Sequence, residues 1–136
     1  LIKNEQRKYV QIRILSKTYG EKINKLFSKI NVNDYSPDFI KRNTVPSEID
    51  GLKYIKNCFY IYAKIGSAVA VDHKYVFRFR RKSKDQKVIT KKLYSSNETN
   101  PKTTEEGIKL GTYEIKWPDN NNDIDITTEV TFENEM

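Results

Sequence analysis

The sequence predicts a single α+β domain in which N-terminal helices pack on a long, curved antiparallel sheet. The chain has 136 residues, a length that suits one domain. Residues 1–30 show apolar positions at helical spacing, whereas residues 52–136 are rich in β-branched and aromatic residues that alternate with polar ones. The segment between them, residues 31–51, is expected to form a short helix and a loop.

A leading helix is predicted from Asn4 to Ile30, because apolar residues recur there at alternating spacings of three and four. This spacing is typical of a heptad seam, which here has one polar member, Ser16, and a weak point at Gly20 that can separate two helices. The seam consists of Tyr9, Ile12, Ser16, Tyr19, Ile23, Leu26 and Ile30. Two interpretations stay open: the helix covers the sheet, or its first half packs against other copies of the chain. In the second case the interface residues are Tyr9, Ile12, Tyr19 and Ile23.

A short helix is expected after Ser36. A serine accepts a hydrogen bond from a free amide at the start of a helix, and Pro37 suits the first helical turn. One or two turns over residues 38–42 follow, and Pro46 ends any helix at that point.

The sheet is predicted to be organised around two long strands between Tyr54 and Lys82. Both are rich in aromatic and β-branched residues that alternate with polar ones, and a tight turn at Gly66-Ser67 joins them into a hairpin. In the second strand Phe77 and Phe79 are expected to be buried, because they share one face.

Three further strands are predicted over residues 87–95, 108–117 and 125–133. The polar segment from Ser96 to Gly107 has no periodicity and is predicted to be a mobile loop. The segment that begins at Pro118 is predicted to be a turn.

The composition favours an anionic partner. Lys and Arg number 25 against 18 Asp and Glu, so the formal net charge is +7. Basic residues are concentrated near the end of the second long strand, and the candidate patch is Arg78, Arg80, Arg81, Lys82 and Lys84. Such a patch, with nearby tyrosines, is compatible with weak, nonspecific, salt-dependent binding of single-stranded nucleic acid. The alternative is a solvated strand end whose charge serves solubility.

The sequence shows no catalytic or metal-binding motif. Asp72 and His73 are neighbours, but adjacent residues of a strand point to opposite faces and cannot pair within it. Cys58 is the single cysteine, which excludes an internal disulfide and a cysteine zinc cluster. It shares strand parity with Tyr60 and Tyr62 and is expected to be an inert thiol. We therefore expect no enzymatic activity, no cofactor and no metal.

The predicted order of elements resembles that of the cystatin-like α+β roll, a fold also seen in nuclear transport factor two. This order is a leading helix, then a short helical segment, then a long curved sheet. Two stretches carry a closer resemblance: EKINKLFSKINVNDYSPDFIKRN and GLKYIKNCFYIYAKIGSAVAVDHKYVFRFRRKSKDQK. They resemble the closing helices and the hairpin with a basic tip in the soluble C-terminal domains of Gram-positive conjugative transfer proteins of the TraM and TcpC type. Those domains are similar to the VirB-eight scaffold of type IV secretion channels. The resemblance covers Glu21 to about Lys92, and the long loop after Tyr94 departs from it.

The resemblance implies a non-enzymatic scaffold domain of a plasmid conjugation channel for DNA transfer, which acts by protein–protein interaction. It implies contacts with other transfer-channel proteins and self-association, with a homotrimer as the expected assembly. It also implies a position on the cell-wall side of the membrane, tethered by a segment before Leu1. The chain begins with Leu1 and has its single methionine at Met136, which fits an excised or processed domain. A basic small β-domain that binds single-stranded nucleic acid is the alternative function.

Overall fold

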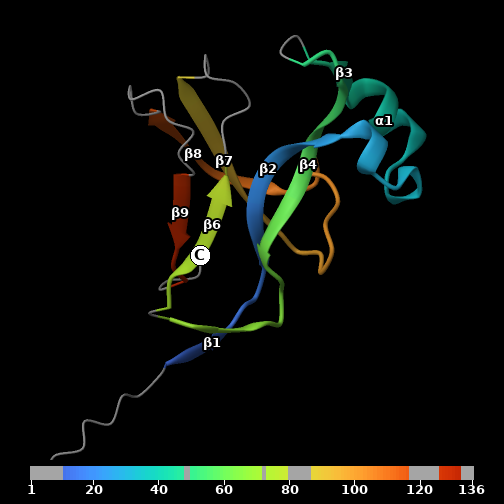
Figure 1. Ribbon diagram of the computed structural model, residues 1–136. Helices are drawn as coiled ribbons and strands as arrows, with labels where there is room; N and C mark the ends of the chain where they lie inside the picture. Colours follow the sequence, from blue (N-terminus) through green and yellow to red (C-terminus); the bar gives the residue numbers. More distant parts are fainter. Residues whose placement is uncertain (1–10, 48–49, 72, 80–86, 117–125, 133–136) are drawn as a thin grey trace, which may run out of the picture.

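The computed structural model describes residues 11–47, 50–71, 73–79, 87–116 and 126–132 (Figure 1). Within these ranges the chain is mainly β-structure with one α-helix, a loose form of the α+β class predicted. The strands are β1 (Ile12–Ile14), β2 (Thr18–Leu26), β3 (Thr44–Pro46), β4 (Lys53–Ala63), β5 (Ala68–Ala70), β6 (Tyr75–Phe79), β7 (Val88–Ser96), β8 (Ile108–Lys116) and β9 (Ile126–Val130). The helix is α1 (Pro37–Asn43), preceded by two 3-10 turns, η1 (Phe27–Lys29) and η2 (Val32–Asp34).

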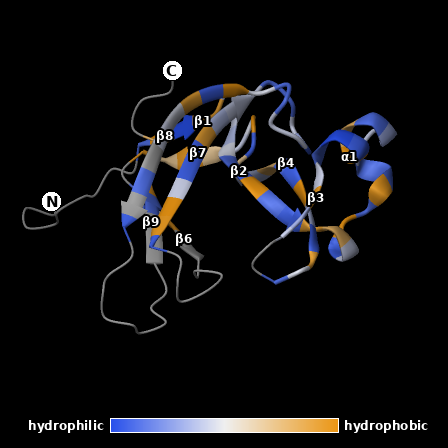
Figure 2. Cartoon of the chain, turned by 90° about the horizontal axis from the view of Figure 1, so that it is seen from above, coloured by the Kyte–Doolittle hydropathy of each residue, from blue (hydrophilic) through white to orange (hydrophobic). Residues whose placement is uncertain are grey.

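The strands form one antiparallel sheet of five strands and two ribbons of two strands. The order in the large sheet is β3-β4-β2-β7-β8, while β1 pairs with β5 and β6 pairs with β9. Figures 1 and 2 show α1 at one end of the molecule, beside β3 and β4, and the β6–β9 ribbon toward the other end. Strand β2 therefore lies in the middle of the fold, with hydrogen-bonded neighbours on both sides.

The predicted leading helix is wrong over the part of it that the structure describes. Residues 12–14 and 18–26 are strands, and only the short 3-10 turn after Leu26 is helical. Over short stretches, the apolar spacing of this segment fits the helical period as well as the alternation of a strand. Its Ile, Tyr and Thr residues favour the pleated surface of a sheet. The segment forms a strand because its backbone hydrogen-bonds to both β4 and β7. A helix bonds its backbone groups internally and would gain neither of these ladders.

The predicted hairpin between Tyr54 and Lys82 is correct in its turn and wrong in its pairing. Gly66 has φ of +83°, the left-handed conformation that the turn prediction requires. The flanking strands do not pair with each other, however: β4 pairs with β2 and β3, β5 with β1, and β6 with β9. Alternation along a strand specifies which residues share a face, and it carries no information about the neighbouring strand. The side chains of Phe77 and Phe79 lie outside the described residues.

A bulge in β4 changes which of its residues are buried. Asn57 is the one described non-glycine residue with positive φ, at +63°, and the register with β2 shifts there. Ile55 and Cys58, three residues apart on the two sides of the bulge, consequently belong to the same buried cluster, whereas Tyr60 is 43% exposed. Beyond the bulge the register is regular from Cys58 to Tyr60, so the predicted shared parity of these two residues is confirmed, whereas Tyr62 lies at a second register shift between Ile61 and Ala63.

The short helix is confirmed. Ser36 Oγ accepts a hydrogen bond of 3.1 Å from the backbone amide of Phe39, and Pro37 is in the first turn. The helix ends at Asn43, and the edge strand β3 follows directly and ends at Pro46. Phe39 packs with Tyr35, Ile55 and Cys58, so the helix covers one part of β4.

The predicted strands over residues 87–95, 108–117 and 125–133 are confirmed as β7, β8 and β9, with their ends shifted by a few residues. The polar segment between β7 and β8, predicted to be a mobile loop, is bonded to the sheet. Lys102 accepts a hydrogen bond from the amide of Phe59 at 3.0 Å, and Asn57 accepts one from the amide of Thr104 at 2.9 Å. The loop therefore covers the edge of β4 beyond β3.

Candidate functional site

Of the four residues predicted to form an oligomer interface, the three that the structure describes do not share a surface. Ile12 lies on β1 and is 62% exposed. Tyr19 packs against Phe132, with ring centroids 5.7 Å apart, and Ile23 packs against the core under α1. Tyr9 lies outside the described residues. The heptad seam is thus divided between two strands and two cores, because the segment is not helical.

The predicted basic patch lies almost wholly outside the described residues. Of its five members only the backbone of Arg78 is described, in β6 opposite Thr127. Nothing in the structure tests the patch formed with Arg80, Arg81, Lys82 and Lys84.

Among the residues that the structure describes, neither His73 nor Cys58 has catalytic partners around it. His73 is exposed and makes an edge contact with the ring of Tyr75 at 4.7 Å, while Asp72 lies outside the described residues. Cys58 is buried between β4 and α1, and burial raises the pKa of its thiol. A thiol with a raised pKa holds less thiolate at neutral pH, which agrees with the inert cysteine that the sequence predicts. Among the described residues no group of three or more His, Cys, Asp and Glu side chains has the placement to hold a metal.

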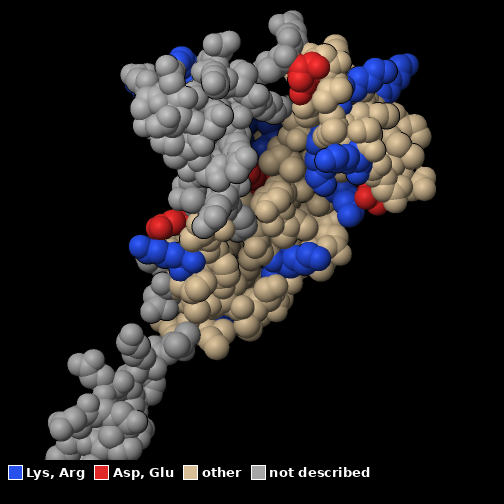
Figure 3. Space-filling view, viewed as in Figure 1, with Lys and Arg blue, Asp and Glu red and all other residues tan. Residues whose placement is uncertain are grey.

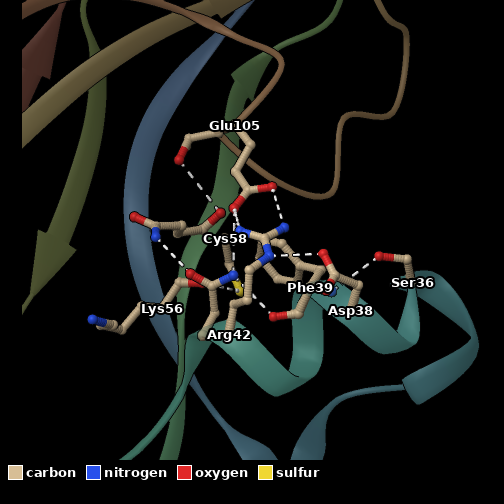
Figure 4. Close-up of polar contacts among 10 residues, drawn as sticks. Ser36, Asp38, Phe39, Arg42, Lys56, Cys58 and Glu105 are labelled. Atoms are coloured by element: carbon tan, nitrogen blue, oxygen red, sulfur yellow. Dashed lines mark hydrogen bonds and ion pairs between the residues drawn. The ribbon is translucent and has the colours of Figure 1, made fainter.

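A polar cluster ties α1 to the loop between β7 and β8 (Figure 4). Arg42 donates to both carboxylate oxygens of Glu105, at 2.7 and 3.1 Å, and to Asp38 at 2.8 Å. These carboxylates raise the pKa of Arg42, and Arg42 lowers the pKa of Glu105. Asn57 donates to Asn43 at 2.7 Å, so the bulge in β4 is linked to the same cluster. Every polar group named here has a protein partner, which indicates a structural role.

A shallow hollow of about 260 Å³ lies beside this cluster, between the start of α1 and the loop. Its charged lining residues are Asp34, Glu98, Lys102, Glu105 and Glu106. The Nζ atom of Lys102 lies 3.8 Å from Oδ2 of Asp34 in this hollow. The hollow is acidic in a basic protein, and it has no arrangement of ligands for a metal among the described residues.

One face of the large sheet holds a buried ion pair. Glu21 of β2 accepts a hydrogen bond from Lys91 of β7 at 3.0 Å and another from the Tyr62 hydroxyl of β4 at 2.9 Å. The side chains of Glu21 and Lys91 are 8% and 13% exposed. Glu21 therefore joins three neighbouring strands through two polar contacts.

The opposite face carries lysines that the sequence did not single out. Lys22 and Lys92 follow Glu21 and Lys91 in the chain, and consecutive side chains of a strand point to opposite faces. Lys56 of β4 and Lys109 of β8 lie close enough to Lys22 to influence its pKa. We call Lys22, Lys56, Lys92 and Lys109 the lysine row. The four are far apart in the sequence, so no local motif marks them, and only the strand order brings them together.

The β1–β5 ribbon presents an apolar face. Ile12 pairs with Ala70 and Ile14 with Ala68, and directly paired residues share a face. The two isoleucines are 62% and 61% exposed. The other face of the ribbon packs into the core through Val69, which is 3% exposed. Within the described ranges the outer edge of β1 has no neighbouring strand.

No helix in the described part of the chain has the length and apolar character needed to cross a membrane. Comparison with protein-family models, with curated proteins and with solved structures returned no match for this chain.

Proposed function

We propose that the chain is a non-enzymatic assembly domain that works by binding further copies of itself through the β1–β5 ribbon. One observation carries the proposal: the exposed face of this ribbon is apolar at all four of its paired positions, Ile12, Ile14, Ala68 and Ala70. Exposed apolar side chains that adjoin one another are typical of interaction surfaces.

A second copy is the occupant that suits this surface. The outer edge of β1 offers unpaired backbone groups within the described ranges, and an antiparallel pairing of β1 with β1 of a second copy is two-fold symmetric. Such a pairing sets Ile12 of each copy beside Ile14 of the other, and it joins the two apolar faces. The face carries no charge, so it is a region where two chains of net charge +7 approach without direct repulsion.

The finer features of the resemblance belong to this proposal. The domain would serve as a scaffold in a type IV secretion-like channel for conjugative DNA transfer, with other channel proteins as further partners. It would lie on the cell-wall side of the membrane, tethered by a segment before Leu1, and its sheet would curve as in the cystatin-like roll. The expected trimer rested on the resemblance and on a helical seam, whereas pairing through β1 favours a dimer.

Association is tested by light scattering coupled to gel filtration, over a range of protein concentrations. We expect the protein to dimerise as concentration rises, and to dimerise more readily at higher salt, because salt screens the repulsion between basic chains. Ile12→Asp with Ile14→Asp is expected to abolish the dimer, because it buries carboxylates in the contact.

The matched control is Val32→Asp with Leu52→Asp. These two residues are each 49% exposed and lie outside the ribbon, and the charge change is the same. A wild-type protein that stays monomeric throughout, or a dimer that both double variants weaken equally, contradicts the proposal.

A further inference from the structure

The lysine row crosses four neighbouring strands of the large sheet. In the order β4-β2-β7-β8 each strand contributes one member. Glu21 pairs with Leu93, so continuing this register by one residue sets Lys22 opposite Lys92. On the far side of β7, Lys109 is the cross-strand partner of Tyr94, two residues along from Lys92. Lys56 lies between Ile55 and Cys58, the partners of Lys25 and Ile23. The four lysines therefore follow a diagonal across the strands, on the face opposite the Glu21–Lys91 ion pair.

The row has no compensating negative charge among the described residues. None of its four lysines takes part in an ion pair there, in contrast to Lys91 on the other face. The pKa of Lys22 is lowered by burial first, and then by the positive charges of Lys92, Lys56 and Lys109. No carboxylate is among the causes that act on Lys22. An anion placed on the row relieves this repulsion.

The shape of the row selects the kind of anion. Neighbouring strands are about 4.8 Å apart, so a diagonal row across four strands is at least about 14 Å long and one lysine wide. A narrow line of charge fits a chain of phosphates better than it fits a flat membrane surface. Figure 4 shows the Lys56 side chain extending away from Arg42 and Glu105, so it is not drawn into the polar cluster beside it. On the face seen in Figure 3, basic side chains are more widespread than acidic ones.

An aromatic ring lies within the row. Tyr94 is directly opposite Lys109 in the β7–β8 ladder and two residues from Lys92, so all three side chains share a face. The Tyr94 side chain is partly exposed. Lysines that contact phosphates, beside an aromatic ring on which a base can stack, are the combination typical of surfaces that bind single strands.

We propose that the lysine row and Tyr94 form a binding site for single-stranded nucleic acid, held by its phosphates and by the stacking of one base. The site reads no sequence, because lysine contacts to phosphates carry no base information. It is separate from the predicted basic patch, which begins at Arg78, and it does not depend on the proposed assembly.

The test measures fluorescence anisotropy of a labelled oligothymidylate of about 16 nucleotides, a length that a small β-domain covers. With four phosphate contacts, binding is expected to weaken about 50-fold between about 50 and 200 mM salt. This corresponds to a slope near −3 when the logarithm of the binding constant is plotted against the logarithm of the salt concentration. The variant Lys56→Glu with Lys109→Glu changes two exposed residues, and we expect it to weaken binding at least about tenfold and to reduce the slope by more than about 1. Tyr94→Leu is expected to weaken binding about tenfold with an unchanged slope.

The matched control is Lys29→Glu with Lys41→Glu, two exposed lysines outside the row that undergo the same change in charge. It is expected to change affinity by less than about threefold, because distant charges are largely screened. Equal losses in the two lysine pairs would show that net charge alone is responsible, which overturns the site. Lys22→Gln with Lys92→Gln checks the centre of the row, with thermal melting to verify folding, and unchanged binding by a folded variant also overturns it.

Two further probes separate the single strand from other phosphate sources. A duplex of the same length and vesicles containing phosphatidylserine are each expected to bind more weakly than the oligothymidylate. Tighter binding of the duplex or of the vesicles, or a Tyr94→Leu variant with wild-type affinity, overturns the assignment to single-stranded nucleic acid.

Discussion

Replacing Glu21 by Ala is expected to reduce the free energy of unfolding by about 3–5 kcal/mol, the range found when one partner of a buried ion pair is removed. The change removes the carboxylate that lies 3.0 Å from the ammonium group of Lys91, a side chain that is only 13% exposed. It also removes an acceptor of the Tyr62 hydroxyl, which donates to Glu21 at 2.9 Å. The loss is large because the Lys91 ammonium group stays desolvated while it loses a charged partner at close range.

Urea denaturation followed by circular dichroism measures this loss. Glu114→Ala removes an exposed carboxylate from β8 and serves as the control, with an expected change within about 0.5 kcal/mol. Glu21→Leu with Lys91→Met removes both charges and is expected to recover most of the loss, because a buried pair contributes little beyond its apolar replacement. A change below about 1 kcal/mol for Glu21→Ala would contradict the buried pair.

Replacing Gly20 by Ala is expected to destabilise the fold by about 3 kcal/mol or more, at the upper end of the range for overpacking. A Cβ at this position would collide with the carbonyl oxygen of Tyr60 and would lie 2.5 Å from Cε1 of Phe59. The first of these atoms is backbone in a hydrogen-bonded ladder, so it cannot move aside without breaking the pairing of β2 with β4.

Gly111→Ala is the matched control, since it is also a strand glycine but has no atom within 4 Å of its added Cβ. We expect its melting temperature to stay close to that of the wild type. If residue 20 were helical, Ala would be the better residue by about 1 kcal/mol. An unchanged or raised melting temperature for Gly20→Ala would therefore contradict the central strand.

Local signals in the sequence predicted local structure. The Ser36-Pro37 cap, the turn at Gly66 and the strands that became β7 and β8 depend on residues adjacent in the chain, and the structure has them all. The segment of β2 was mispredicted because its apolar residues satisfy a helical spacing. The close approach of β4 at Gly20, which excludes any side chain there, is a long-range contact that no pattern within the segment reveals.

The candidate surfaces depend on strand order and were therefore beyond sequence reasoning. Lys22 and Lys109 are separated by most of the chain and belong to one row only because β7 lies between β2 and β8. Likewise, Ile12 was predicted as an interface residue for a helical seam, but its apolar neighbours are Ile14 and the paired Ala68 and Ala70. The sequence indicates which residue types are suited to binding, and the topology determines which of them are neighbours.

The central claim is that residues 18–26 form the middle strand of the sheet, with Glu21 facing inward and Lys22 facing outward. Nuclear Overhauser effects between backbone protons in the isotope-labelled protein test it most directly. The claim predicts cross-strand contacts from Glu21 to both Tyr60 and Leu93, its partners in the two ladders. A run of contacts between successive amide protons from Thr18 to Leu26, with no contacts to Tyr60 or Leu93, is the pattern of a helix and would contradict it.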